Sequence, residues 1–331
     1  MLLIALYALS YFVPFYLSAT TRPSPTLSRD APSVVRGRIR SVTLSCLVCT
    51  AVTFVLLTRA WPGVPGSGPD VGGPPRPPAA TPREALHLLG LWPPALRDAG
   101  RALLLTALLF LGPLFSYFVV ERGWADWARL APLREVCTEW TAWRNIVAGP
   151  ITEEILFRSA SIPLMLLAQA PARRTVFLTP VLFGLAHVHH FYEFRLTHPR
   201  VPAARALARS AFQLAYTSLF GAYAAFLFLR TGSLAAVCAA HAFCNCMGLP
   251  RVWGRVEPVP VLAGGDVDES SSGGGGNGGQ QKNGRRPSIL WTVAYYVLLV
   301  GGAVLWWRNL WVLSESENAL VPTSAFSQSP A

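Results

Sequence analysis

The amino-acid sequence predicts an all-α membrane protein, a polytopic bundle of about eight transmembrane helices. Of its 331 residues, 52% are hydrophobic and 14% are charged, and a mean hydropathy of +0.38 is too apolar for an ordinary soluble domain. Apolar runs long enough to cross about 30 Å of hydrocarbon occur eight times. They cover residues 1–19, 41–59, 102–120, 146–169, 175–191, 210–229, 233–250 and 289–312.

The segments around these runs have compositions of their own. The first run starts at Met1 with no basic region and no small-residue cleavage site, so we expect a retained span. Residues 61–82 are rich in proline and glycine and predict a loop, because proline interrupts helices. A short amphipathic helix is expected at about 83–100. Residues 264–287 are rich in glycine and serine, which predicts flexible coil.

The net charge of +11 indicates membrane topology rather than nucleic-acid binding, because the arginines are scattered through short loops. The loop at 20–40 holds one acid, Asp30, against Arg22, Arg29, Arg36, Arg38 and Arg40, and is therefore placed in the cytosol. Alternation then makes 121–145, 192–209 and 251–288 cytosolic too. The pair Arg173 and Arg174 falls on the other side and opposes this orientation.

The fourth apolar run contains two adjacent carboxylates, Glu153 and Glu154, followed by Arg158. An ionisable side chain near the bilayer centre costs at least about 2.5 kcal/mol, so these groups need partners. Other runs supply His187, and His241 with Asn245. In the predicted topology all six side chains lie in the cytosolic half of the bilayer, which predicts a common site.

The residue types suit peptide hydrolysis. Glu154 and Arg158 are four apart and share a helix face, so they can pair while Glu153 points elsewhere. A glutamate near a histidine can act as a general base on water. His241 and Asn245 can donate hydrogen bonds to an oxyanion. This combination hydrolyses a peptide bond without a covalent nucleophile.

Structural and non-enzymatic roles compete with this interpretation. Glu154 with Arg158 can be a buried ion pair, and Glu153 can relay protons or coordinate ions in a transporter. His241 or Asn245 can link helices. The same Glu and His residues could also bind zinc, although no His-Glu-x-x-His pattern is present. Four further histidines have weaker assignments: His189 and His190 as interfacial, His198 as solvated, and His87 without an evident partner.

Three segments in order resemble the type II CAAX prenyl endopeptidase family, the Ras-converting enzymes of the endoplasmic reticulum. They are residues 144–158 (RNIVAGPITEEILFR), 183–190 (FGLAHVHH) and 241–250 (HAFCNCMGLP). Each motif alone is weak. The three in this order, spread over roughly 140–250, are a strong signal for the family. The patterns at 187–190 (HVHH) and 243–250 (FCNCMGLP) are more similar to its eukaryotic branch than to its bacterial members.

The resemblance implies removal of the last three residues from proteins whose cysteine, fourth from the C-terminus, carries a farnesyl or geranylgeranyl group. It implies that Glu153 and His187 activate water, that His241 and Asn245 stabilise the oxyanion, and that Glu154 and Arg158 hold Glu153. No cofactor or metal is implied, with zinc as the lesser alternative. The expected partners are prenylated CAAX proteins, such as small GTPases, and the lipid of the membrane. Nucleic acid is not expected as a partner. The expected location is the endoplasmic reticulum membrane, with the site facing the cytosol.

The chain is accordingly divided into four parts. Residues 1–140 form N-terminal spans with the proline-rich loop 61–82, and 141–250 form the catalytic membrane core. Residues 251–288 form a flexible loop, and 289–331 form the last span and a C-terminal tail. A zinc-dependent membrane protease and a non-enzymatic transporter or scaffold remain the alternatives for the whole protein.

Overall fold

The computed structural model describes residues 1–24, 27–61, 79–256 and 288–327, and the regular elements in these ranges are all helical. The predicted all-α class is therefore confirmed. In chain order the elements are α1 (Leu2–Phe12), α2 (Pro14–Leu17), α3 (Pro32–Ala60), α4 (Pro82–Leu88), α5 (Leu96–Leu109), α6 (Leu111–Phe115), η1 (Ser116–Val120), α7 (Trp124–Ala128), α8 (Ala131–Thr138), α9 (Trp140–Trp143), η2 (Arg144–Ala148), α10 (Gly149–Glu154), η3 (Ile155–Ala160), α11 (Ile162–Leu167), α12 (Ala172–Ala186), α13 (His189–Thr197), α14 (Ala203–Thr231), α15 (Leu234–Met247), α16 (Ile289–Leu313) and η4 (Thr323–Phe326).

Three helices in the described ranges are long and apolar enough to cross a membrane, namely α3, α14 and α16. A fourth candidate is the pair formed by α5 and the segment Leu111–Val120, which is bent by 81°. The described ranges thus hold three or four candidate spans, whereas the sequence predicts eight over the whole chain. The first and seventh predicted runs form shorter apolar helices, Leu2–Leu17 and Leu234–Met247. The structure is that of a helical membrane protein with several short or broken helices.

Prolines explain the breaks in two of the predicted elements. The expected helix at 83–100 is instead two helices, α4 and α5, because Pro93 and Pro94 interrupt it. The fourth predicted span is divided into α10, η3 and α11, with Pro150 and Pro163 in the first turns of α10 and α11. Most of the loop predicted at 61–82, and all of the coil predicted at 264–287, lie outside the described residues.

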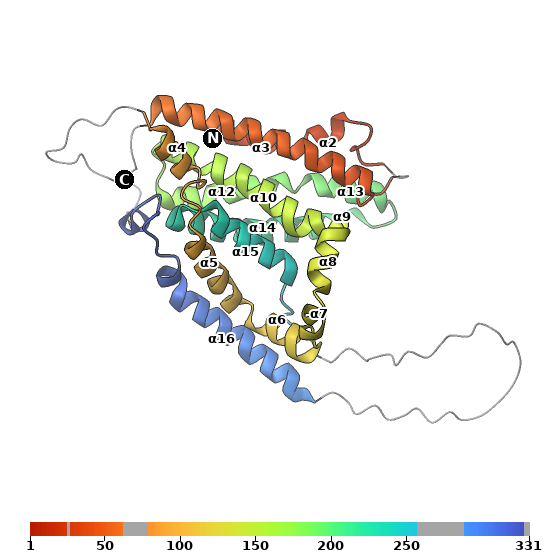
Figure 1. Cartoon of the computed structure of the whole chain (residues 1–331). Helices are drawn as coiled ribbons and strands as arrows, with labels where there is room; N and C mark the ends of the chain where they lie inside the picture. Colours follow the sequence, from red (N-terminus) through yellow and green to blue (C-terminus); the bar gives the residue numbers. More distant parts are fainter. Residues whose placement is uncertain (25–26, 62–78, 257–287, 328–331) are drawn as a thin grey trace, which may run out of the picture.

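The helices pack as a bundle in which α12 lies along α14, α15 packs on α5, and α16 runs along α5 and α6 (Figure 1). Small residues permit the close approaches. A Cβ on Gly184 would collide with Ser218 of α14, and a Cβ on Gly302 would collide with the Leu108 carbonyl of α5. Glycine at such contacts lets helix backbones pack closely without a side chain between them.

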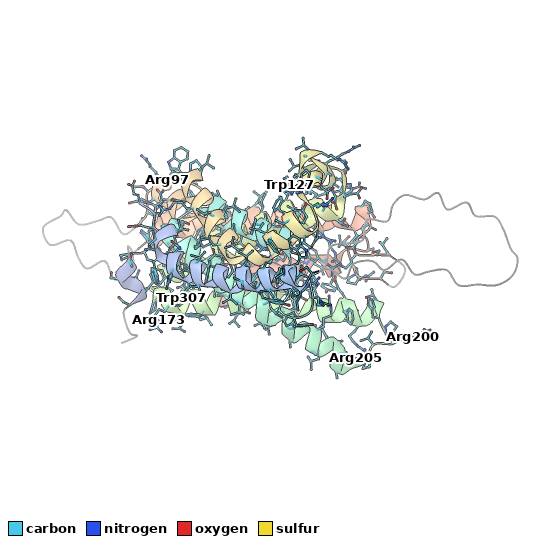
Figure 2. All side chains as sticks on the ribbon, turned by 90° about the horizontal axis from the view of Figure 1, so that it is seen from below. Arg97, Trp127, Arg173, Arg200, Arg205 and Trp307 are labelled. Atoms are coloured by element: carbon cyan, nitrogen blue, oxygen red, sulfur yellow. The ribbon has the colours of Figure 1, made fainter. Side chains whose placement is uncertain are left out.

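The bundle has two ends. One end carries α2, α13 and the start of α3, and the opposite end carries α4 and the C-terminus (Figure 1). Figure 2 places Arg173 at the C-terminal end and Arg200 and Arg205 at the other end. Exposed arginines therefore lie at both ends of the bundle, so their distribution alone does not assign one end to the cytosol.

Candidate active site

The two adjacent glutamates lie on a short helix between two π-helical turns. Pro150 has no backbone N–H, and just before it the Gly149 N–H donates to the Arg144 carbonyl five residues back. Helix α10 then runs only to Glu154, where η3 begins. Insertions of this kind change the direction in which successive side chains point and often occur at functional sites.

Glu154 forms a closed, buried ion cluster. Its Oε1 atom accepts from Arg158 Nη1 at 3.0 Å and lies 2.6 Å from His241 Nδ1. The guanidinium lies over the Phe183 and Phe220 rings, with its Cζ atom 4.5 and 5.8 Å from the ring centroids. The predicted Glu154–Arg158 pair is thus confirmed, and His241 is added to it.

A glycine provides the space for this cluster. A Cβ on Gly221 would come within 3.1 Å of Arg158 Nη2, so a larger residue there would press on the guanidinium. Within the described part of the chain, Glu154 Oε2 and Arg158 Nη2 are buried without a hydrogen-bond partner. A single carboxylate oxygen, Glu154 Oε1, therefore contacts both the guanidinium and the imidazole.

Glu153 has a different environment from its neighbour. It lines a cavity of about 180 Å³ and its side chain is 19% exposed, whereas that of Glu154 is fully buried. The Tyr11 hydroxyl donates to Glu153 Oε1 at 3.3 Å, and His241 Nε2 lies 3.8 Å from Oε2. His241 therefore connects the carboxylate that lines the cavity with the fully buried one.

His187 and Asn245 line the same cavity. His187 Nδ1 lies 2.9 Å from the Phe183 carbonyl oxygen, which can only accept, so Nδ1 carries the proton and Nε2 of the neutral ring can accept one. Asn245 Nδ2 donates to the Asn145 carbonyl oxygen at 2.8 Å. The structure thus brings the six predicted side chains together, four in direct contact and two on the cavity wall.

Two histidines that the sequence placed at the interface also belong to the cavity wall, His189 and His190. The His189 ring stacks on Phe12 of α1 at 5.2 Å. His198 is exposed, as predicted. The wall therefore combines residues of α1, α10, α13 and α15, which are distant in the sequence.

Sequence reasoning missed a second buried carboxylate, Glu193 of α13. Its Oε1 accepts from Arg38 at 2.7 Å, and its Oε2 lies 3.2 Å from His190 Nδ1 and 3.5 Å from Arg29. Burial opposes the charge on Glu193, but the His190 hydrogen bond and the Arg38 charge outweigh burial and lower its pKa to about 2. The sequence did hold one signal for this contact, an acidic residue that follows two adjacent histidines, His189 and His190, on the same helix.

Metal ligation has one geometric candidate in the described ranges. His189, His190 and Glu193 bring ligand atoms within 4.8 Å of one another. Both oxygens of Glu193 already face arginines, which opposes a further cation there.

Sequence reasoning also missed the contact between the Tyr11 hydroxyl and Glu153. The signal available in the sequence was a tyrosine within an apolar run.

Comparisons with known proteins agree on one family. The family model "Type II CAAX prenyl endopeptidase Rce1-like" matches residues 136–247. The chain is 33% identical to "Probable CAAX prenyl protease 2" of Schizosaccharomyces pombe, over 74% of this chain and 79% of that protein. Proteins named "CAAX prenyl protease 2" are 34% identical in Arabidopsis thaliana, over 75% and 79%, and 35% identical in Homo sapiens, over 72% and 69%.

No solved structure matches the chain. The matched family segment contains all six residues of the site described above, and the relatives match well beyond it. The chain therefore belongs to the type II CAAX prenyl endopeptidases, a family of membrane proteases.

Proposed function

We propose that this protein removes the C-terminal tripeptide from prenylated CAAX proteins by direct attack of water, with Glu153 as the general base. One observation carries the proposal. Of two adjacent carboxylates, Glu154 is fixed in a buried ion cluster, and Glu153 faces a cavity that also contains His187 and Asn245. A base must reach its substrate, and only Glu153 of the two can do so.

Glu153 takes a proton from water while the water oxygen bonds to the carbonyl carbon of the prenylated cysteine. His187 Nε2 accepts the second hydrogen bond of that water and orients it. When the C–N bond breaks, Glu153 returns the proton to the leaving amine. The Tyr11 hydroxyl, which donates to Glu153 Oε1, holds the carboxylate in position.

His241 and Asn245 stabilise the oxyanion that forms on the carbonyl oxygen. An ionised Glu154 only accepts hydrogen bonds, so His241 Nδ1 carries a proton. Donation from Nε2 as well requires the imidazolium form. With that form, the charges of Glu153, Glu154, Arg158 and His241 sum to zero, which suits an apolar surrounding. The Asn245 amide supplies the second donor.

The substrate's lipid places the reaction at the membrane. A prenyl chain partitions into hydrocarbon at about 0.8 kcal/mol per buried CH₂, which brings the adjacent scissile bond to the interface. We place the cavity at the cytosolic face of the endoplasmic reticulum, because two arginines of the arginine-rich segment 20–40 line its wall, Arg29 and, in the first turns of α3, Arg38. Prenylated small GTPases carry the required chemistry at their C-termini.

The test is release of the tripeptide from a farnesylated CAAX peptide by membranes that contain the protein. We expect release by the wild type, no detectable release by Glu153→Gln, and full activity from Glu139→Gln, a matched change at an exposed glutamate. A zinc chelator should leave the rate unchanged. Release by Glu153→Gln would contradict the general-base role. Loss of activity with chelator would instead favour a zinc protease, and a fully inserted wild type without activity would favour a transporter or scaffold.

A further inference from the structure

Arginines from two distant segments gather at the cavity that contains Glu153. Arg29, Arg38 and Arg144 all line its wall. Arg29 and Arg144 also line an adjoining cavity of about 350 Å³, so they stand where the two cavities meet. This concentration of positive charge is larger than the proposed hydrolytic step requires.

The three arginines are engaged in different ways. Arg38 is 11% exposed and is bonded to Glu193 and to the Thr21 carbonyl oxygen. Arg144 Nη1 instead pairs at 2.7 Å with Asp30 Oδ1, and Arg29 Nε lies 3.8 Å from the same oxygen. The Asp30 side chain is 52% exposed. A carboxylate that is half in solvent is readily displaced, because an exposed ion pair contributes little.

Arg144 is also connected to the proposed oxyanion site. Its Nε donates to Asn145 Oδ1 at 3.0 Å, and the Asn145 carbonyl oxygen accepts from Asn245 Nδ2 at 2.8 Å. A released tripeptide in extended form spans roughly 10 Å, at about 3.3–3.6 Å per residue. A group that binds its end must therefore lie near the oxyanion donors and belong to the same cavity, as Arg144 does.

We infer that Arg144 and Arg29 bind the C-terminal carboxylate of the substrate, and that Asp30 occupies this place when no substrate is bound. The inference rests on the proposed function, since only an enzyme that cuts three residues from a C-terminus meets that carboxylate here. Arginine suits the role because its planar fork pairs with a carboxylate through two parallel hydrogen bonds. The charge of the other acid facing these arginines, Glu193, is balanced by Arg38, and its second oxygen lies 3.2 Å from His190 Nδ1. The subsite makes the enzyme selective for a free C-terminus.

The test compares two farnesylated CAAX peptides that differ only at the C-terminus, one a free acid and the other an amide. We expect the wild type to show a KM for the acid that is about tenfold or more below that for the amide. Arg144→Gln and, separately, Arg29→Gln should raise the KM for the acid and leave that for the amide unchanged. Asp30→Asn should act in the opposite direction, lowering the KM for the acid by about two- to fivefold.

Arg36→Gln is the matched control, because Arg36 is exposed on the same segment and lies over the Trp140 ring outside the cavity wall. It should change neither KM. Equal KM values for acid and amide in the wild type would overturn the subsite while leaving the proposed function intact. An equal rise for both peptides in Arg144→Gln would also overturn it. Cleavage of neither peptide by inserted wild type would overturn the proposed function and this assignment together.

Discussion

The two ends of the bundle use buried polar groups in opposite ways. At the C-terminal end, Arg230 donates to Thr323, Ser314 and the Trp311 carbonyl, all neutral oxygens supplied by the end of α16 and the tail. At the other end, ionisable groups surround an open cavity. One of them, Glu153, lines the cavity and has its nearest basic group, His241 Nε2, 3.8 Å away. Closed hydrogen bonding fixes the tail, whereas at the open end one carboxylate, Glu153, lines a cavity.

The tail after α16 is also hydrogen-bonded to α5. Asp98 of α5 accepts from Ser316 at 2.6 Å and from Asn318 at 3.4 Å. Arg101 of the same helix donates to the backbone carbonyls of Val312 and Glu315. Changes at this end should therefore affect stability alone. Among the residues at the cavity, some changes should lower activity alone and others should lower stability.

The largest effect is expected for Arg158→Ala. Removing Arg158 leaves the buried ion cluster with one negative charge in excess, which destabilises by about 3–5 kcal/mol. The matched change Arg230→Ala leaves only neutral oxygens without a donor and should destabilise by about 1–3 kcal/mol. Unfolding temperatures in detergent measure both. A smaller loss for Arg158→Ala than for Arg230→Ala would contradict the charged-cluster account.

Asn245→Ala should reduce turnover with little change in stability. Losing one oxyanion donor lowers kcat by about 10²- to 10³-fold. Asn245 is exposed and its described side-chain bond is to one backbone oxygen, so the unfolding temperature should stay close to that of the wild type. Single-turnover cleavage of a farnesylated peptide gives the rate. An unchanged rate would assign Asn245 to packing.

Glu193→Gln should lower stability in a pH-dependent manner. The folded pKa of Glu193 is about 2, below the usual value near 4.3, so the folded state favours the carboxylate. Its contribution, about 2–3 kcal/mol, is present above about pH 4.3 and is lost as the pH falls toward 2. The wild type and the variant should therefore differ most at pH 7 and converge in acid. A constant difference between pH 7 and pH 3 in unfolding temperature would contradict this sign.

The smallest effect is expected for Ser316→Ala at the closed end. The change removes the 2.6 Å hydrogen bond to Asp98 and should destabilise by about 1 kcal/mol. The cleavage rate should not change, because neither Ser316 nor Asp98 is among the residues that line the cavity. A reduced kcat with a normal unfolding temperature would show that the two ends are coupled.

The sequence predicted which side chains lie together better than it predicted where the helices begin and end. Spacing alone placed Glu154 and Arg158 on one face, and ionisable groups in apolar runs identified the other partners. Spacing did not reveal that His241 contacts both glutamates, because that contact joins α10 and α15. It also could not pair Arg38 with Glu193, since 155 residues separate them and arginines clustered beside an apolar run indicate topology first.

Helix breaks limited the prediction of the fold. Hydropathy reads residues 102–120 as one span, but the chain bends by 81° between Leu109 and Leu111. Residues 146–169 likewise score as one apolar run, although π-helical turns divide it on both sides of α10. Composition records how much apolar surface a run has and not where its backbone hydrogen bonds change partner.

The most direct test measures cleavage and thermal unfolding in the same preparations of Glu153→Gln and Glu154→Gln. The two changes are chemically identical and adjacent. The account predicts that Glu153→Gln keeps the wild-type unfolding temperature and loses about 10²- to 10⁴-fold in cleavage rate, whereas Glu154→Gln lowers the unfolding temperature. A Glu153→Gln protein that cleaves at the wild-type rate, or that unfolds as early as Glu154→Gln, would contradict the division between a catalytic and a structural carboxylate.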